Sequence, residues 1–483
     1  MAGEGQTQHR ALRRGVARFS GLLLALLLAL GPATASPDFR RASTEALELL
    51  QKLVRADTTN PPGNEILAAK ILEEFLVKEG LTCEVVEPEP TRGNLICRLH
   101  GKGDARPLLV LAHLDVVGVD ADQWRVPPFS GRLRDGHVYG RGVLDDKGMA
   151  AAIAEALALM AREEIVPARD VIFVGTADEE SSGGLGLEWL LENRPELLEA
   201  EMALNEGGRI LKVGGEIVLA GVQNDEKIYL DLKLLARGES GHSSLPGTDS
   251  AIITLARALM RLTEHRFPPR IRPSVVGYFE ALSLSQQAST AHCMTRLEDP
   301  AEGALCADIL SQNAVWNAQL RTTCTPTIID GGFRANLIPS QAEANLNCRL
   351  LPGTDLQEHL RELEQVFSGL QVRIEPPGER QPPPPASPME GPLPGAIRRA
   401  MERLAPDAQV VAYTSPGGTD SRLLRQRGIP AYGLLPFPLE EGDAKLMHGD
   451  NERLSLESFA FGVKVMYEIL IEASSSVTPV EEP

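Results

Sequence analysis

The sequence predicts an α/β protein in which a mostly parallel sheet lies between helices and a second α+β domain is inserted. Residues 108–112 and 171–175 are apolar without alternation, as expected for strands that are buried on both faces. The Ala-rich residues 147–161 have a helical pattern and separate these two strands. Strands that alternate with helices predict a parallel sheet covered by helices. From about Asp225 onward the apolar pattern changes, which predicts a second domain.

The remaining elements of the first domain follow from the same patterns. Apolar residues at helical spacing occur on both sides of the turn Asn60-Pro61-Pro62-Gly63, and short apolar runs follow them. Helices are therefore predicted at residues 42–55, 64–78 and 185–191, and strands at 83–86 and 95–99.

The second domain is predicted from a change to alternating strands. Residues 227–236 alternate between apolar and polar side chains, which is typical of a half-exposed strand. Further strands are predicted at 325–329 and 342–350, and helices at 250–263 and 356–367. We therefore expect an inserted α+β domain at residues 226–369.

A proline-rich stretch follows the insertion. Residues 375–394 include four consecutive prolines, a composition that excludes a helix or a central strand and predicts a stiff connector. Patterns of the first type resume after it. The predicted organisation is then a signal at 1–35, a first domain made of 36–225 and 370–475, the insertion, and a flexible polar tail at 476–483.

The N-terminus has the features of an export signal. A basic start is followed by the apolar run 21–30 and by Ala33-Thr34-Ala35, which are small residues suited to cleavage before Ser36. The alternative is an uncleaved membrane anchor, but spanning a bilayer takes about 20 residues. A periplasmic or secreted location is expected.

The charge and the cysteines narrow the function class. A formal charge of −18 makes nucleic acid or an anionic membrane a poor partner, and no later segment is apolar for long enough to span a membrane. The six cysteines have no zinc-finger spacing. In an oxidising compartment they could pair, and although six cysteines allow fifteen connectivities, sequence neighbours suggest Cys83–Cys97, Cys293–Cys306 and Cys324–Cys348.

Acidic residues and a histidine follow the predicted strands directly. His113 and Asp115 come after the strand at 108–112, and Asp178-Glu179-Glu180 come after the strand at 171–175. Glu206 follows the apolar run 202–204. In open α/β sheets, ligands bind at the carboxyl ends of strands. At spacing i, i+2 on an extended chain, His113 and Asp115 point to the same side, which suits a metal ligand and a carboxylate that braces it.

Each cluster also has a structural alternative. His113 and His448 could be loop histidines, Asp145 and Asp146 could cap the helix that follows them, and the three acids could be a solvated helix start. Taken together, however, the clusters lie at strand ends of one α/β domain. Imidazole and carboxylate ligands suit Zn²⁺, and a carboxylate shared by two ions gives a metal pair that activates water.

In their order along the chain, these motifs resemble the di-zinc peptidase family that includes aminoacylase, succinyl-diaminopimelate desuccinylase, glutamate carboxypeptidase and carboxypeptidase S. Residues 112–117, 124–131 and 139–148 are most similar to the branch of carboxypeptidase S and secreted N-acyl-amino-acid hydrolases. The resemblance covers nearly all of 40–475 and implies two Zn²⁺ per subunit, for which Co²⁺ or Mn²⁺ can substitute. It also implies that residues 279–322 enlarge the lid domain.

The resemblance implies a role for each matched residue. One zinc would be held by His113 and Glu206 and the other by Glu180 and His448, with Asp145 bridging them. Glu179 would be the general base, and Asp115 would orient His113.

The inserted domain resembles the lid and dimerisation domain of this family. His242 would reach the active site of the partner subunit and stabilise the oxyanion. Asn336, Arg349, Gly418 and Thr419 would bind substrate, with the Arg349 guanidinium and the Gly418-Thr419 loop on its free carboxylate. A homodimer is expected.

The function expected is zinc-dependent hydrolysis of an amide bond next to a free carboxylate. The leading hypothesis is a carboxypeptidase or dipeptidase that acts on short peptides. The alternative is an aminoacylase that acts on N-acyl amino acids, and the metal residues do not separate the two. A more remote alternative is a non-catalytic binding protein on the same scaffold; such proteins usually lose the base or a ligand, but Glu179 and all five ligands are present.

Overall fold

The computed structural model describes the chain outside residues 2–36, 182, 376–377, 379–382 and 476–483. The predicted export signal and the predicted tail lie outside the described residues. Within the described part of the chain, no helix has both the length and the apolar character needed to cross a bilayer.

An eight-stranded mixed sheet forms the centre of the first fold unit, in the order β1-β2-β6-β3-β7-β16-β8-β15. β3 runs parallel to both β6 and β7, β7 runs parallel to β16, and β8 runs parallel to β15. The strands are β1 (Thr82–Val86), β2 (Asn94–Leu99), β3 (Leu108–His113), β6 (Val171–Thr176), β7 (Met202–Val213), β8 (Glu216–Glu226), β15 (Gln409–Ser415) and β16 (Ala431–Glu440).

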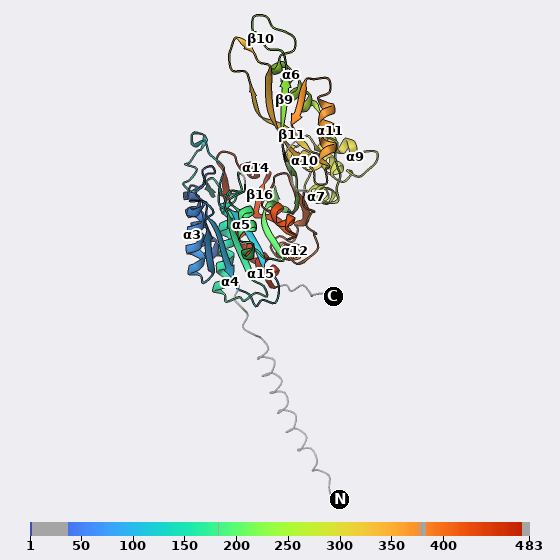
Figure 1. Cartoon of the computed structure of the whole chain (residues 1–483). Coiled ribbons are helices and arrows are strands. Elements are labelled where there is room, and N and C mark those ends of the chain that lie inside the picture. Colours follow the sequence, from blue (N-terminus) through green and yellow to red (C-terminus); the bar gives the residue numbers. More distant parts are fainter. Residues whose placement is uncertain (2–36, 182, 376–377, 379–382, 476–483) are drawn as a thin grey trace, which may run out of the picture. The chain divides into compact units, whose positions relative to one another are not determined.

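Helices cover both faces of this sheet because its central strands are apolar on both sides. Leu108 and Val110 face one core, whereas Leu109 and Leu111 face the other. The first core is packed by α2 (Phe39–Arg55), α3 (Glu65–Lys78), α4 (Lys147–Arg162), α12 (Pro392–Leu404) and α15 (Leu456–Ser475), and the second by α5 (Leu187–Asn193) and α13 (Ser421–Gln426). The blue and red segments of Figure 1, from the two ends of the sequence, therefore share one sheet.

Between β8 and β15 the chain forms a second, antiparallel sheet in the order β11-β13-β9-β14. Helices α6 (Ala251–Glu264) and α11 (Leu356–Val366) pack on it around a core of its own. Its strands are β9 (Ile228–Arg237), β11 (Thr323–Gly331), β13 (Gln341–Leu350) and β14 (Val372–Glu375). The predicted fold class, an α/β sandwich with an inserted α+β unit, is confirmed. The boundaries 226–369 stay a prediction, and β14 lies beyond the second of them.

Residues 279–322, expected to enlarge the lid, do not join the core of the second sheet, and the enlargement stays a prediction. Helices α7 (Pro273–Ser283), α8 (Ala288–Met294), α9 (Gly303–Leu310) and α10 (Ala314–Leu320) build a separate core that contains Leu219 of β8 and Tyr413 of β15. The Tyr278 and Tyr413 rings lie 5.5 Å apart. These helices cover the edge of the first sheet, because β15 is its outermost strand and would otherwise expose apolar side chains.

Three disulfides join the cysteines in the pairs suggested by sequence neighbours. Cys83–Cys97 connects β1 to β2, and Cys324–Cys348 connects β11 to β13. Cys293–Cys306 connects α8 to α9. The remaining short elements are β4 (Arg132–Arg134), β5 (His137–Tyr139), β10 (Gly241–His242), β12 (Leu337–Ile338), β17 (Arg453–Ser455), α14 (Glu441–Ala444) and the 3-10 helices Ala121–Gln123 and Pro195–Leu197.

Candidate metal centre

The parallel register of β3 and β6 brings two of the predicted clusters together. His113 is the last residue of β3 and lies opposite Thr176, the last residue of β6. The residues that follow Thr176 are therefore beside His113 at the carboxyl edge of the sheet. His113 is buried, with 2% of its surface exposed.

Asp145 lies between two histidines. His113 Nε2 is 2.9 Å from Asp145 Oδ1, and His448 Nε2 is 3.0 Å from Asp145 Oδ2. His448 Nε2 is also 3.1 Å from Glu180 Oε1. Four of the five predicted ligands thus contact one another, and each oxygen of one carboxylate faces a different imidazole.

Glu206 and Glu179 add negative charge to this cluster. Burial raises the pKa of Glu206 well above its ordinary value, and the charges of Asp145 and Asp146 raise it further. Burial is also the largest cause of the raised pKa of Glu179, and the charge of Glu206 raises this pKa further. Hydrogen bonds to Asp145 and Glu180 raise the pKa of His448 to about 10. Buried carboxylates at this density require cations close by.

The donors fit a metal pair. Ligand atoms of His113, Asp145 and Glu180 lie within 4.8 Å of one another. Imidazole nitrogen and carboxylate oxygen are ligands that Zn²⁺ accepts. Both carboxylate oxygens of Asp146 are buried without a hydrogen-bond partner, and Asp146 makes no side-chain cap to α4. The capping alternative therefore does not account for the Asp-Asp pair.

Gly207, which follows Glu206, adopts a backbone conformation that other residues rarely adopt. It has a φ of +104°, and a Cβ at this position would lie 2.1 Å from Gln223 Oε1. Only glycine fits here, because a side chain would meet both backbone strain and a collision. The strand β7 therefore passes Gly207 in close contact with Gln223.

Asp115 connects His113 to the segment of Glu179 and Glu180. Its two carboxylate oxygens accept hydrogen bonds from the backbone N–H groups of Glu179 at 3.1 Å and Glu180 at 3.0 Å. Its Oδ1 is 3.5 Å from His113 Nδ1, which also lies 3.0 Å from the Asp115 carbonyl oxygen. One buried carboxylate thus holds three residues of the site in place.

A polar chain behind Asp115 was not predicted. Asn60 Nδ2 donates to Asp115 Oδ2 and to Asp178 Oδ1, both at 2.9 Å. Arg92 donates to Asp178 at 3.0 Å and to both oxygens of the buried Glu65 at 2.7 and 2.8 Å. Asp178 has a φ of +64°, a left-handed conformation that is uncommon for a residue other than glycine. In the sequence, only the turn Asn60-Pro61-Pro62-Gly63 marks this position, and a turn by itself does not predict a polar chain.

Glu452 was also missed. It is fully buried and accepts hydrogen bonds from Arg141 Nη1 at 2.7 Å, from the Gly142 N–H at 3.1 Å and from the Leu144 N–H at 2.7 Å. Arg141 Nη2 is 3.3 Å from the His448 carbonyl oxygen. The pair therefore ties the segment of Asp145 to the segment of His448, which is over 300 residues away in the chain.

The predicted carboxylate site combines a residue of the second sheet with the loop that follows β15. Arg349 is on β13, and its Nη1 is 4.0 Å from a Cβ built on Gly418. The Thr419 hydroxyl donates to Glu226 at 2.8 Å and accepts from Gln223 at 3.3 Å. Since that hydroxyl is occupied, a substrate contact from Thr419 would come from its backbone.

His242 and Asn336 lie together on a two-stranded ribbon. Gly241 and His242 form β10, which pairs with Leu337 and Ile338 of β12. The Ser243 N–H donates to the Asn336 carbonyl oxygen at 3.1 Å, and the His242 Nδ1 contacts the Ser244 hydroxyl at 2.7 Å. Both side chains are exposed. Within the described residues, neither makes a hydrogen bond or ion pair with the acidic cluster.

Comparison with known proteins places these motifs in context. The model of peptidase family M20/M25/M40 matches residues 109–472. Human N-fatty-acyl-amino acid synthase/hydrolase PM20D1 is 31% identical over 388 residues, which cover 78% of this chain and 76% of the relative. Probable carboxypeptidase S-like 2 of Dictyostelium discoideum is 29% identical over 373 residues, which cover 76% and 71% respectively.

Solved structures share the fold. An M20 family metallo-carboxypeptidase of Sulfolobus solfataricus has a TM-score of 0.65 at 19% identity and covers 89% of this chain and 99% of its own. Human carnosine dipeptidase 1 has a TM-score of 0.66 at 16% identity, with 91% and 98% covered. The Bacillus subtilis protein YXEP, described as a dinuclear metal-binding peptidase, has a TM-score of 0.56 at 16% identity, with 90% and 99% covered.

Proposed function

This chain belongs to peptidase family M20/M25/M40 and is a hydrolase, and from that premise we propose that it cuts an amide bond next to a free carboxylate, as a carboxypeptidase or dipeptidase on short peptides. The observation that carries the proposal is the position of Asp145 between His113 and His448. Glu180 contacts the same group.

The metal residues divide into two sets around Asp145. His113 and Glu206 would hold one Zn²⁺, and Glu180 and His448 the other. Two bound metal ions would polarise the scissile carbonyl and lower the pKa of the attacking water. Co²⁺ or Mn²⁺ can substitute, because both accept the same nitrogen and oxygen donors.

Glu179 is the general base of the proposed reaction. It takes a proton from the attacking water and passes it to the leaving amine. Burial raises the pKa of Glu179 above its ordinary value, which favours the carboxyl form that Glu179 adopts after it takes the proton. Asp115 keeps the backbone of Glu179 in place, and the free carboxylate of the substrate is bound by Arg349 and the Gly418-Thr419 loop.

An aminoacylase is the second candidate, and the relative PM20D1 favours it. That relative is named as an N-fatty-acyl-amino acid synthase/hydrolase and is 31% identical to this chain. Both candidate reactions cut an amide bond next to a free carboxylate, so they share every residue role above. The acyl side of the substrate distinguishes them.

A homodimer completes the proposed site through the second sheet. β11 is an outer strand with Ile328 and Ile329 exposed at 67% and 66%. On α6, Ile252, Ile253 and Met260 are exposed as well. An apolar outer strand and helix of this kind fit a second copy of the same chain. His242 would then enter the active site of the partner subunit and stabilise the oxyanion, and Asn336 would contact substrate.

Dimerisation has a direct test. Ile329→Lys places a charge on the outer strand and should convert the dimer to a monomer in sedimentation velocity, with loss of turnover. Val166→Lys, which adds the same charge at an exposed apolar position outside the second sheet, is the control. A wild-type monomer with full activity, or unchanged turnover in His242→Ala, would exclude the role of His242 across the interface.

Export to the periplasm or the cell exterior also belongs to this proposal. Three disulfides support it, because disulfides persist in oxidising compartments. Expression with N-terminal sequencing of the exported protein tests the predicted cleavage before Ser36.

The activity is tested by a substrate panel in the presence of Zn²⁺ or Co²⁺. Gly-X dipeptides are compared with N-acetyl and N-fatty-acyl amino acids. Glu179→Gln should retain both metals but lose about 10²- to 10⁴-fold in kcat. Absence of turnover on every substrate would leave the non-catalytic binding protein, and a fully active Glu179→Gln enzyme would exclude the assigned base.

A further inference from the structure

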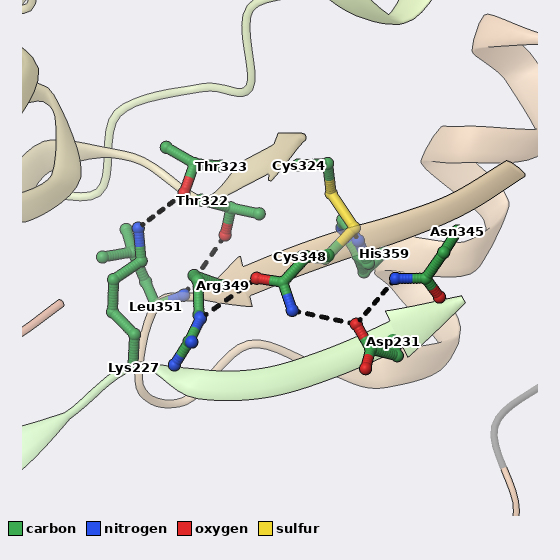
Figure 2. Close-up of a disulfide and its surroundings, with 11 residues drawn as sticks. Lys227, Asp231, Thr322, Thr323, Cys324, Asn345, Cys348, Arg349, Leu351 and His359 are labelled. Carbon is green, nitrogen blue, oxygen red and sulfur yellow. Dashed lines mark hydrogen bonds between the residues drawn. A yellow bond between two sulfur atoms is a disulfide. The ribbon is translucent and has the colours of Figure 1, made fainter. Parts of the chain in front are cut away.

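The outer face of the second sheet carries a polar cluster around Arg349. β13 and β9 pair so that Arg349 lies opposite Tyr229 and Asn347 lies opposite Asp231. These side chains point away from the core of the second sheet, where Cys348 is joined to Cys324. Figure 2 shows Asn345, Cys348 and Arg349 on β13 and Asp231 on β9.

Among the residues that the structure describes, Arg349 has no acidic contact partner. Its guanidinium lies over the Tyr229 ring at 4.5 Å, and its Nε donates to Asn347 Oδ1 at 3.2 Å. Within the described residues, no carboxylate oxygen lies within 4.0 Å of the Arg349 guanidinium. Burial lowers the pKa of Arg349 from its ordinary value, while the more distant charges of Asp231 and Glu226 act in the opposite direction.

The nearest acid of the cluster is occupied by other donors. Asp231 Oδ1 accepts from Asn347 Nδ2 at 2.8 Å and from Asn345 Nδ2 at 3.2 Å. Its Oδ2 accepts from the Tyr229 hydroxyl. Asn347 therefore stands between Arg349 and Asp231: it offers its oxygen to the cation and its amide N–H₂ to the anion.

We propose that Asn347 and Tyr229 are positioning residues that hold Arg349 as a cation without a contact anion, so that Asn347 determines the preference for substrates with a free carboxylate. The proposal rests on the function proposed above. Tyr229 supports the guanidinium from one side, and the neutral amide of Asn347 fixes its plane without neutralising its charge. The Nη groups lie next to the Gly418 loop, and the substrate carboxylate is then the first anion that contacts them.

Asn347→Asp tests this role. A carboxylate at this position would pair with Arg349, because a charge-assisted hydrogen bond is about twice as strong as a neutral one. Asn345→Asp is a matched control. Like Asn347, Asn345 is an asparagine on the same face of β13 and donates to Asp231. Unlike Asn347, it makes no contact with Arg349.

The measurement compares N-acetyl-leucine with N-acetyl-leucinamide. In Asn347→Asp, KM for the carboxylate should rise about tenfold or more, which corresponds to about 1.4 kcal/mol, while kcat changes less than about twofold. The carboxamide should be processed as before, so the preference for the carboxylate should fall by the same factor. Asn345→Asp should keep the wild-type preference. An unchanged KM in Asn347→Asp, or an equal rise in both variants, overturns the proposal.

Calorimetric binding of the same two compounds to the Glu179→Gln protein separates this inference from the proposed reaction. One outcome is that the wild type hydrolyses neither compound while the Glu179→Gln protein binds N-acetyl-leucine and the added Asn347→Asp change weakens that binding. In that case the proposed reaction is wrong, but the role of Asn347 stands. If the parent binds neither compound, the inference falls too. Should Asn347→Asp fail to fold, Asn347→Ala replaces it, since it frees Arg349 to pair with Asp231 and should also weaken carboxylate binding.

Discussion

Glu452→Gln should destabilise the protein and weaken its metal site together. Glu452 is fully buried and accepts three hydrogen bonds, one of them from Arg141. Glutamine keeps one acceptor oxygen but replaces the other with an N–H₂ group that faces existing donors. The Arg141 side chain, only 3% exposed, then keeps a charge without its partner.

The magnitude follows from these contacts. Removing one partner of a buried ion pair costs about 3–5 kcal/mol, because the remaining charge is left uncompensated. Arg141 also contacts the backbone of His448, and Leu144 precedes Asp145. A shift of either segment moves a predicted metal ligand, and loss of such a supporting residue typically weakens metal affinity by about 10- to 100-fold.

Urea unfolding and competition with a zinc chelator measure the two effects. Glu457→Gln is the control, because the Glu457 side chain is 85% exposed and only 3.6 Å from Lys212 in a surface pair. It should change stability by less than about 1 kcal/mol. If Glu452→Gln unfolds at the wild-type urea concentration and keeps wild-type zinc affinity, Glu452 does not connect the two segments.

Three further predictions concern pH, the site and its metals. Burial raises the pKa of Glu155 to about 8, so its contribution to stability is complete below its unfolded-state pKa and is lost as the pH rises through 8. Glu155→Gln should therefore flatten this loss of stability in thermal melts from pH 5 to pH 9. Parallel stability curves for the variant and the wild type would contradict this prediction. Asn60→Ala removes hydrogen bonds to Asp115 and Asp178, so it should lower the free energy of urea unfolding by about 2–4 kcal/mol and also lower kcat. A wild-type unfolding free energy together with a wild-type kcat would show that Asn60 does not support the site. Chelation should lower the melting temperature, and added Zn²⁺ at about 1,000 times its Kd should restore about 4 kcal/mol; a melt insensitive to chelator would argue against a metal at Asp145.

The fold class and the candidate metal ligands were accessible from the sequence. Continuous apolar runs require burial on both faces, and this alone identifies the strands at 108–112 and 171–175. His113 ends the first of these strands and Glu180 follows shortly after the second, so the register of β3 with β6 brings the two residues near each other. By contrast, β7 extends over Met202–Val213, well beyond the apolar run that predicted it, because glycines and polar residues after Glu206 are held by strand pairing.

The sequence by itself determined the alternation of strands and helices and the chemical character of the residues at the strand ends, because hydrophobic periodicity and donor type are local properties. Only the tertiary structure decided how these residues are held. The contacts of Asn60 with Asp178, of Glu452 with Arg141, and of Asn347 with Arg349 depend on which segments become neighbours and on the direction of each side chain. Packing also placed α7–α10 against the edge of the first sheet. These arrangements arise from long-range burial and hydrogen bonding, which no local pattern in the chain encodes.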